Sequence, residues 1–275
     1  MFKVNKHIFK TDKHIDVKLL LISDIHYSEK FDKKLEEKII LEIEKVKPNY
    51  ICICGDIIDN YPYFNKQDNI DKLKNFIEKI SITKTFIIFG NHDLEDVKHH
   101  FSDFSESIKK WKNIFKNSKN IYLLDNTNYC DAYVNFIGIN LSSGYYHNKK
   151  HEDGSVLGTL LSKVKVSDKY NILLVHSPIR VMENVDHLKN IDLVLCGHMH
   201  DGAIFKWLKW LPGNRGIIGP HKILFPKHAR GIIHKDDISM LVTGGITKLA
   251  PSHLKIHKLS SILYNSEIEL INIRG

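Results

Sequence analysis

Short apolar runs alternate along this chain with segments in which apolar residues follow helical spacing. Helical spacing is clearest in residues 35–46, where Pro48 ends the helix, and in residues 70–80. Two further helices are predicted at 103–117 and 154–166. The uninterrupted apolar runs predict buried strands at 17–23, 50–54, 85–89, 121–124, 134–139, 171–175 and 193–196, followed by tail strands at 238–242, 259–264 and 267–271. Strands that alternate with helices are typical of α/β layering.

The composition agrees with one folded domain. The chain has 275 residues and contains 43% hydrophobic and 26% charged residues, which suits a single large α/β domain over residues 1–275. We find no internal repeat and no low-complexity linker. The first residues lack the apolar stretch of a targeting signal, and Leu19–Ile22 is too short to cross a bilayer. We therefore expect a cytoplasmic location.

The cysteines and the charge add little to this picture. Cys52, Cys54 and Cys196 lie in predicted strands, so we expect small buried thiols and a reducing compartment. The net charge of +8 favours anionic partners such as phosphate esters, nucleic acids or acidic lipids. Lysines are spread along most of the chain and form no long basic stripe, so nucleic acid is not favoured as the partner.

Five polar motifs follow predicted strands directly. Open α/β sheets bind ligands at the carboxyl ends of their strands, so we expect these motifs to converge although 176 positions separate the first from the last. Taken alone, each motif also fits an ordinary turn. Their occurrence in series at strand ends favours a shared site. The motifs are Asp24-Ile25-His26, Gly55-Asp56-Ile57-Ile58-Asp59, Gly90-Asn91-His92-Asp93, His176 and Gly197-His198-Met199-His200.

The residue types in these motifs are ligands of divalent cations. On an extended segment, Asp24 and His26 would point the same way and could hold one ion together. His198 and His200 have the same spacing. The carboxylate of Asp56 has two oxygens and could bridge two cations. Two metals about 3.5–4 Å apart are the usual means of cleaving phosphate esters.

The series of motifs resembles the pattern of the calcineurin-like metallophosphoesterase superfamily, which is D-x-H, G-D-x-x-D, G-N-H-D/E, a lone His and G-H-x-H. The resemblance implies an α/β (α+β) fold, a four-layer sandwich of two mixed β-sheets flanked by helices. It implies two divalent metal ions. The first would take Asp24, His26, Asp56 and His200, and the second Asp56, Asn91, His176 and His198. Mixed carboxylate and imidazole ligands suit Mn²⁺, Fe, Zn²⁺ or Co²⁺ better than Ca²⁺.

The resemblance also implies roles for the remaining motif residues. His92 would donate a hydrogen bond or proton to the substrate, and the carboxylate of Asp59 would orient its ring. Asp93 is expected to support the loop. The nucleophile would be a water or hydroxide that bridges the two metals.

Residues 201–235 differ in character from the rest of the chain. Two of the three tryptophans lie in 201–230, together with six Lys or Arg residues and one Asp. We expect either a basic, aromatic flap on the substrate side, able to contact lipid at a membrane surface, or a loop whose aromatic residues pack on the core.

A looser resemblance links this region to bacterial enzymes related to the UDP-2,3-diacylglucosamine pyrophosphatases. Those enzymes often have Gly-Gly-Gln after G-H-x-H, where this chain has Asp201-Gly202-Ala203. It retains Leu211-Pro212-Gly213, Phe225-Pro226-Lys227 and Gly244-Gly245.

The leading functional hypothesis is a metal-dependent hydrolase of a small or lipid-linked phosphodiester or pyrophosphate. Protein phosphatases of the superfamily have Arg-Gly after the second Asp of G-D-x-x-D, whereas Asn60-Tyr61 follow Asp59 here, which argues against a phosphoprotein substrate. A nuclease and a phosphomonoesterase remain alternatives. A non-catalytic scaffold of the same fold is disfavoured because His92 and every expected ligand are retained.

Overall fold

The computed structural model describes residues 2–60, 63, 66–94, 104–142, 145–146, 155–210, 213–220, 223–247 and 264–275. Parts of several sequence predictions lie outside these residues. They are positions 259–263 of the predicted strand 259–264, position 103 of the predicted helix 103–117, position 154 of the predicted helix 154–166, and Leu211-Pro212 of the predicted flap.

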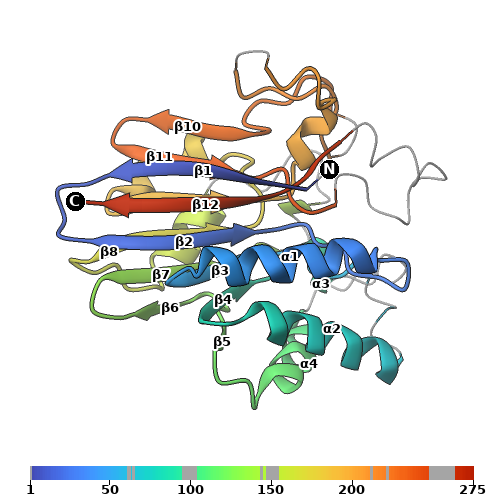
Figure 1. The fold of residues 1–275 in the computed structure, drawn as a ribbon. Coiled ribbons are helices and arrows are strands. Elements are labelled where there is room, and N and C mark those ends of the chain that lie inside the picture. The colour runs from blue at the N-terminus through green and yellow to red at the C-terminus, as the bar shows by residue number, and fades with distance from the viewer. Residues whose placement is uncertain are drawn as a thin grey trace.

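Two six-stranded mixed sheets make up the centre of the molecule (Figure 1). The first has the order β1-β12-β2-β3-β4-β5, in which β2 to β5 are parallel, β12 runs antiparallel to β2 and β1 is parallel to β12. Its strands are β1 (Phe2–Lys10), β2 (Asp16–Ile22), β3 (Tyr50–Cys54), β4 (Lys84–Ile88), β5 (Ile121–Leu123) and β12 (Ser266–Arg274).

The second sheet has the order β10-β11-β9-β8-β7-β6. Strands β11, β9, β8 and β7 are parallel, and the outer strands β10 and β6 are antiparallel to their neighbours. The strands are β6 (Thr127–Cys130), β7 (Val134–Ile139), β8 (Tyr170–Val175), β9 (Leu193–Cys196), β10 (Gly231–Lys235) and β11 (Ile238–Val242).

Helices cover the outer faces of the sheets. Helices α1 (Lys33–Val46), α2 (Gln67–Ile80) and α4 (Ser105–Phe115) pack on the first sheet, and α6 (Ser155–Leu161) lies with short 3₁₀ turns on the second. Asp32 caps the start of α1, since its side chain accepts a hydrogen bond from the amide of Lys34. Lys47, which has a left-handed backbone, caps its end just before Pro48.

The alternation of side chains along each strand separates the two sides of the first sheet. In β3, Ile51 and Ile53 face the helices, whereas Cys52 and Cys54 face the second sheet. Three hydrophobic clusters therefore exist, one between the helices and the first sheet, one between the sheets and one beneath the second sheet. This is the four-layer sandwich of two mixed sheets that the sequence predicted. The cysteines in β3 and β9 are buried and free, also as predicted.

Three strands escaped the sequence prediction. The strands β1, β6 and β10 lie at sheet edges, where one side of each strand lacks a neighbour. Their side chains are mostly polar or half-exposed, so they lack the apolar run that marks a central strand.

None of the helices in the described residues has the length and the apolar character that crossing a membrane requires.

Candidate metal centre

The five motifs meet where the carboxyl ends of the two sheets face each other. The pairing of β2 with β3 continues into their loops, since the amide of Asp24 donates to the carbonyl of Gly55 (3.0 Å) and that of His26 to Asp56 (3.0 Å). From the second sheet, the amide of His198 donates to both carboxylate oxygens of Asp24, at 3.1 and 3.0 Å. Motifs that are distant in the sequence therefore share one site, as the strand-end argument predicted.

Candidate ligand atoms form three overlapping groups among the described residues. They are Asp24, His26 and His200; His26, Asp56 and His92; and Asp56, His176 and His198, with all ligand atoms of a group within 4.8 Å of one another. Asp56 Oδ2 lies 3.1 Å from His176 Nε2 and 3.8 Å from His26 Nε2. His26 thus belongs to the first two groups, and the Asp56 carboxylate joins the last two.

Asn91 lies beside Asp56. It begins the short helix α3 (Asn91–Leu94), and the amide of the next residue, His92, donates to Asp56 Oδ1 at 3.0 Å. The side-chain oxygen of Asn91 is buried and has no hydrogen-bond partner in the described part of the chain.

Other buried ligand atoms are also left without hydrogen bonds. Within the described ranges, neither ring nitrogen of His26 has a hydrogen-bond partner, and His176 Nε2 makes no aligned hydrogen bond although Asp56 is near. A buried polar atom without a partner costs about 1–3 kcal/mol. Cations coordinated by these nitrogens and by the Asn91 oxygen would remove that cost, so the donor set fits divalent metal ions.

Main-chain carbonyls hold two of the candidate ligand rings in orientation. Nδ1 of His176 lies 2.7 Å from the carbonyl oxygen of Cys54, and Nδ1 of His200 lies 2.7 Å from that of Thr247. Each contact places a proton on Nδ1, so that Nε2 is the nitrogen that a cation could bind once the ring is neutral. The sequence analysis did not identify Thr247, although the Gly244-Gly245 pair just before it could have indicated this loop.

His92 is also oriented by a carbonyl. Its Nδ1 lies 2.6 Å from the main-chain oxygen of Asp59. The Asp59 carboxylate, to which the resemblance assigned the orienting role, approaches Nδ1 of His26 at 3.8 Å, and its charge contributes to a raised pKa of His92.

The backbone conformation of Asp24 and His26 differs from the extended segment that the sequence suggested. Asp24 (φ 50°) and His26 (φ 48°) both adopt left-handed conformations, so strand alternation is not what brings them together. Asp56, His198 and His200 share this conformation. Five predicted ligands therefore have backbones that non-glycine residues rarely adopt, and such strain concentrates at functional sites.

Gly55 is required by the close approach of the ligand loops. It has φ 79°, and a Cβ placed on it would lie 2.7 Å from His176 Nδ1 and 2.6 Å from the amide nitrogen of Gly90. Glycine before Asp56 thus permits both the turn and the contact between loops of the two sheets.

The charges in the metal-free site influence one another strongly. Burial and the nearby His92 lower the pKa of His26 well below its usual value. Burial also lowers the pKa of His176, but the Asp56 carboxylate outweighs it and raises that pKa to about 9. For His92, burial is likewise outweighed by Asp56 and by the carbonyl of Asp59, which raise its pKa.

Asp93 supports the loops, as the resemblance implied. One of its carboxylate oxygens accepts from the amides of Ile57 (2.8 Å) and Ile58 (3.1 Å), and the other accepts from that of Gly90 (2.9 Å). Its side chain is buried, and burial together with the charge of Asp56 raises its pKa to about 7. Asp93 therefore joins the second motif to the third without facing the ligand groups.

A buried ion-pair network beside the site was not predicted. Lys209 pairs with Asp201, which follows His200, and with Glu267 Oε2 at 2.7 Å. The other oxygen of Glu267 accepts from the amide of Gly244 at 3.2 Å. Lys209 thereby ties the start of the predicted flap to β12 and to the loop that orients His200.

The tryptophans of the predicted flap do not pack in the core. Trp207 is 51% exposed and Trp210 is 76% exposed. The alternative that the aromatic residues of this segment are core residues is therefore wrong for both side chains.

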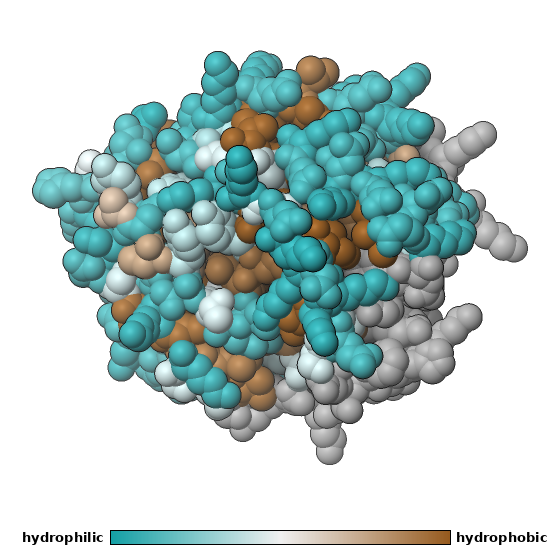
Figure 2. All heavy atoms as spheres, turned by 90° about the horizontal axis from the view of Figure 1, so that it is seen from below, coloured by the Kyte–Doolittle hydropathy of each residue, from teal (hydrophilic) through white to brown (hydrophobic). Residues whose placement is uncertain are grey.

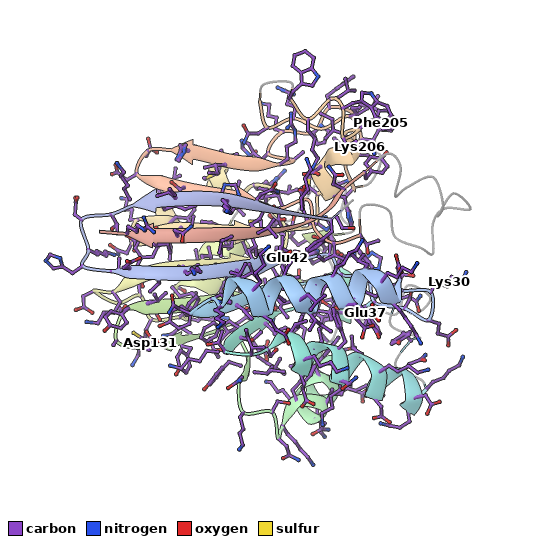
Figure 3. All side chains as sticks on the ribbon, in the orientation of Figure 1. Lys30, Glu37, Glu42, Asp131, Phe205 and Lys206 are labelled. Carbon is purple, nitrogen blue, oxygen red and sulfur yellow. The ribbon has the colours of Figure 1, made fainter. Side chains whose placement is uncertain are left out.

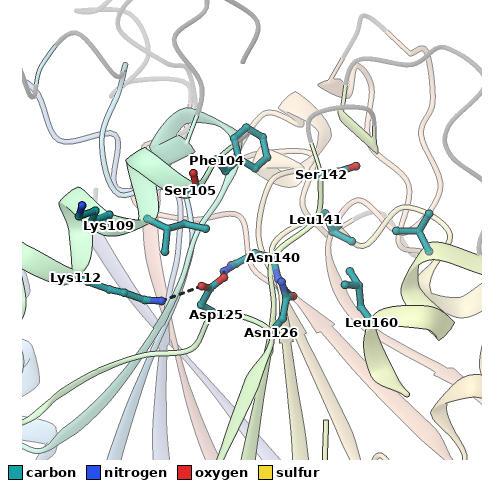
Figure 4. Close-up of a pocket in the computed structure, with 12 residues that line it drawn as sticks. Phe104, Ser105, Lys109, Lys112, Asp125, Asn126, Asn140, Leu141, Ser142 and Leu160 are labelled. Atoms are coloured by element: carbon teal, nitrogen blue, oxygen red, sulfur yellow. Dashed lines mark hydrogen bonds and ion pairs between the residues drawn. The ribbon is translucent and has the colours of Figure 1, made fainter. Parts of the chain in front are cut away.

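A cavity of about 620 Å³ lies between α4 and α6 (Figure 4). Its wall includes Asn140, whose side-chain oxygen accepts from the amide of Phe89 at 2.9 Å. The Lys112–Asp125 ion pair (3.0 Å) forms another part of the wall. Asn140 thus connects the cavity to the loop that carries Asn91 and His92.

Comparison with known proteins relates this chain to the calcineurin-like phosphoesterases. A sequence model of the calcineurin-like phosphoesterases matches residues 17–202. An uncharacterised metallophosphoesterase of Campylobacter jejuni is 26% identical over 210 residues, which is 74% of this chain and 49% of that protein. One from Helicobacter pylori is 29% identical, over 72% of this chain and 48% of its own length. The chain thus spans about half the length of these relatives.

A relative from Aquifex aeolicus, again an uncharacterised metallophosphoesterase, is 24% identical over 74% of this chain and 71% of its own length. Among solved structures, TT1561 of Thermus thermophilus aligns with a TM-score of 0.51 and 13% identity, covering 84% of this chain and 90% of that one. At this identity, the structural likeness concerns the fold alone.

Proposed function

The chain belongs to the calcineurin-like phosphoesterase family, and from this we propose that it is a hydrolase of phosphoester or pyrophosphate bonds with a dinuclear metal centre. The first ion would be held by Asp24, His26, Asp56 and His200, and the second by Asp56, Asn91, His176 and His198.

The observation that carries this proposal is the place of Asp56 between two groups of ligand atoms. Cations held by these residues would supply a water nucleophile near neutral pH and would neutralise charge on the phosphoryl oxygens. Mn²⁺, Fe, Zn²⁺ and Co²⁺ all suit the mixed ligands.

The contacts of His92 support its assignment to the substrate. Its Nδ1 is engaged by the Asp59 carbonyl, so its Nε2 edge is the one available to a phosphoryl or leaving oxygen. A protonated ring could donate from Nε2. Asp59 is a positioning residue in this scheme.

The favoured substrate is a small or lipid-linked phosphodiester or pyrophosphate. Asn60-Tyr61 stand where protein phosphatases of this family have Arg-Gly, so the phosphate-gripping Arg of those enzymes is missing. A nuclease and a phosphomonoesterase remain the alternatives within the family.

The test is hydrolysis of bis(p-nitrophenyl) phosphate by the purified chain with Mn²⁺, Mg²⁺, Zn²⁺ or EDTA, alongside Asp56→Asn. We expect metal-dependent turnover that the variant lacks. Activity that persists in EDTA, or in Asp56→Asn at the full rate, would contradict the proposal. Parallel assays with a nucleotide–lipid pyrophosphate, a p-nitrophenyl monoester and single-stranded DNA would separate the substrate classes.

A further inference from the structure

Exposed hydrophobic side chains concentrate in one short part of the chain. Of the eleven large hydrophobic side chains that are exposed among the described residues, six lie between positions 207 and 225. We name these six the tip patch. They are Trp207, Trp210, Ile218, Ile223, Leu224 and Phe225.

The tip patch comprises two segments that are bonded to each other. Residues 217–220 and 223–225 pair as the two arms of a hairpin, in which the amide of Phe225 donates to the carbonyl of Ile217 (3.0 Å) and Ile218 pairs with Leu224. The Arg230 side chain donates to the carbonyl of Lys209 (3.1 Å), beside Trp210, and to that of Arg215 (3.3 Å), just before the hairpin. The tryptophan segment and the hairpin therefore form one surface.

Aromatic stacking gives the tryptophan segment a fixed base. The ring of Trp207 stacks on Phe205 with centroids 4.9 Å apart, and Phe205 stacks on Tyr264 at 5.8 Å. Figure 3 shows Phe205 and the neighbouring Lys206 at the end of the molecule opposite α2 and α4. The exposed side chains thus stand on an ordered support.

The charge around the tip patch is positive. Residues 201–230 contain six Lys or Arg residues and one acidic residue, Asp201, which is buried against Lys209. Lys206, Arg215 and Lys227 are exposed among the hydrophobic residues. By contrast, the face on the side of α2 and α4 is largely hydrophilic with small hydrophobic areas (Figure 2).

We propose that the tip patch binds the interface of an anionic lipid bilayer. Tryptophan favours the boundary between headgroups and acyl chains, exposed Leu and Ile bury their area in the acyl region, and Lys and Arg attract acidic headgroups. Single-stranded nucleic acid also attracts basic and aromatic residues, but Ile218, Ile223 and Leu224 offer bases no ring on which to stack.

Membrane binding at this surface would place the metal centre at the bilayer. The carbonyl of Gly202, two residues after His200, accepts from the amides of Ile217 (2.7 Å) and Ile218 (3.0 Å). The hairpin is thus anchored directly beside the candidate metal ligands. A lipid-linked phosphoester would then reach the site without leaving the membrane, an extension that rests on the proposed function.

The experiment is sedimentation of the full chain with vesicles of phosphatidylcholine, with and without phosphatidylglycerol, at low and high salt. The test variant is Trp210→Ser/Leu224→Ser. The control is Tyr133→Ser/Leu41→Ser, which removes side chains of similar exposure (57% and 62%, against 76% and 67%) away from the patch. We expect binding to anionic vesicles that salt weakens, a loss of about tenfold or more in the test variant, and none in the control.

Several outcomes would overturn the inference. These are no binding of the folded protein to anionic vesicles, equal loss in both variants, or binding unaffected by the test variant. Affinity for a single-stranded oligonucleotide, but not for vesicles, that depends on Trp210 would assign the surface to nucleic acid instead. Binding is measured without metal or substrate, so an inactive protein that binds vesicles would refute only the proposed function.

Discussion

The main-chain amide of His198 donates a hydrogen bond to each carboxylate oxygen of Asp24, although 174 positions separate the two residues. Asp24 follows the first sheet and His198 the second, so this contact fixes one candidate ligand loop against the other. The metal centre is therefore a product of how the sheets meet, and changes at the junction should affect metal binding before they affect the fold.

Gly197 tests this junction directly. A Cβ on Gly197 would overlap Ser23 Oγ and lie 2.5 Å from Asp24 Oδ2. We expect Gly197→Ala to lower metal affinity about 10- to 100-fold, as loss of supporting contacts does at metal sites. Isothermal titration with Mn²⁺ measures this. Gly213→Ala is the control for backbone strain away from the ligands, because its Cβ meets nothing within 4 Å while its φ of 95° disfavours alanine. Equal affinity of both variants would contradict the role of the junction.

His92 is expected to affect turnover rather than metal content. Its ring lies in one group with His26 and Asp56 and contacts the Asp59 carbonyl, but we assign it to the substrate and not to a metal. His92→Ala should retain its metals and slow turnover by roughly 10²–10⁴-fold, the usual effect of removing an acid–base group. Metal analysis and steady-state kinetics on the same preparation measure the metal content and the turnover rate. A metal-depleted variant, or one with an unchanged rate, would remove His92 from this role.

Lys209 is expected to stabilise the fold. Lys209→Met would remove the ammonium group that pairs with the buried carboxylates of Asp201 and Glu267. Breaking such a pair from one side costs about 3 kcal/mol. Urea denaturation should show a lower midpoint for this variant and almost none of the change for Lys206→Met, an exposed neighbour. Equal midpoints for the two variants would show that the network contributes little.

Metal binding should release protons at neutral pH. The Asp56 carboxylate raises the pKa of His176 to about 9 despite its burial, so this ring is protonated at pH 7 in the metal-free protein. A metal requires the neutral ring, so affinity should rise as pH increases toward 9, with release of about one proton from His176 on binding at pH 7. Calorimetry in buffers of different ionisation enthalpy counts these protons; a buffer-independent heat would contradict the assignment.

Much of the fold and the position of the site could be predicted from the sequence. Central strands such as β3 are buried on both faces and appear as apolar runs, and each candidate ligand follows one of them. Because carboxyl ends of parallel strands share an edge, the convergence of Asp24, Asp56 and His198 followed from their places after strands.

The remaining features depend on three-dimensional contacts that leave no local signal. The left-handed backbones of Asp24 and His26 accompany hydrogen bonds of their amides to Gly55 and Asp56, in the loop after the next strand. The contact of His92 with the Asp59 carbonyl depends on one turn. Lys209 and Glu267 are 58 positions apart, and their pairing requires both sheets to be in place.

The central claim is that Asp56 bridges two metal ions, and Mn²⁺ binding followed by electron paramagnetic resonance tests it most directly. For the wild-type chain we predict two Mn²⁺ per chain with the spectrum of an exchange-coupled pair, and for Asp56→Asn a loss of coupling and of metal. One Mn²⁺ per saturated chain, or coupling that persists in folded Asp56→Asn, would contradict the account.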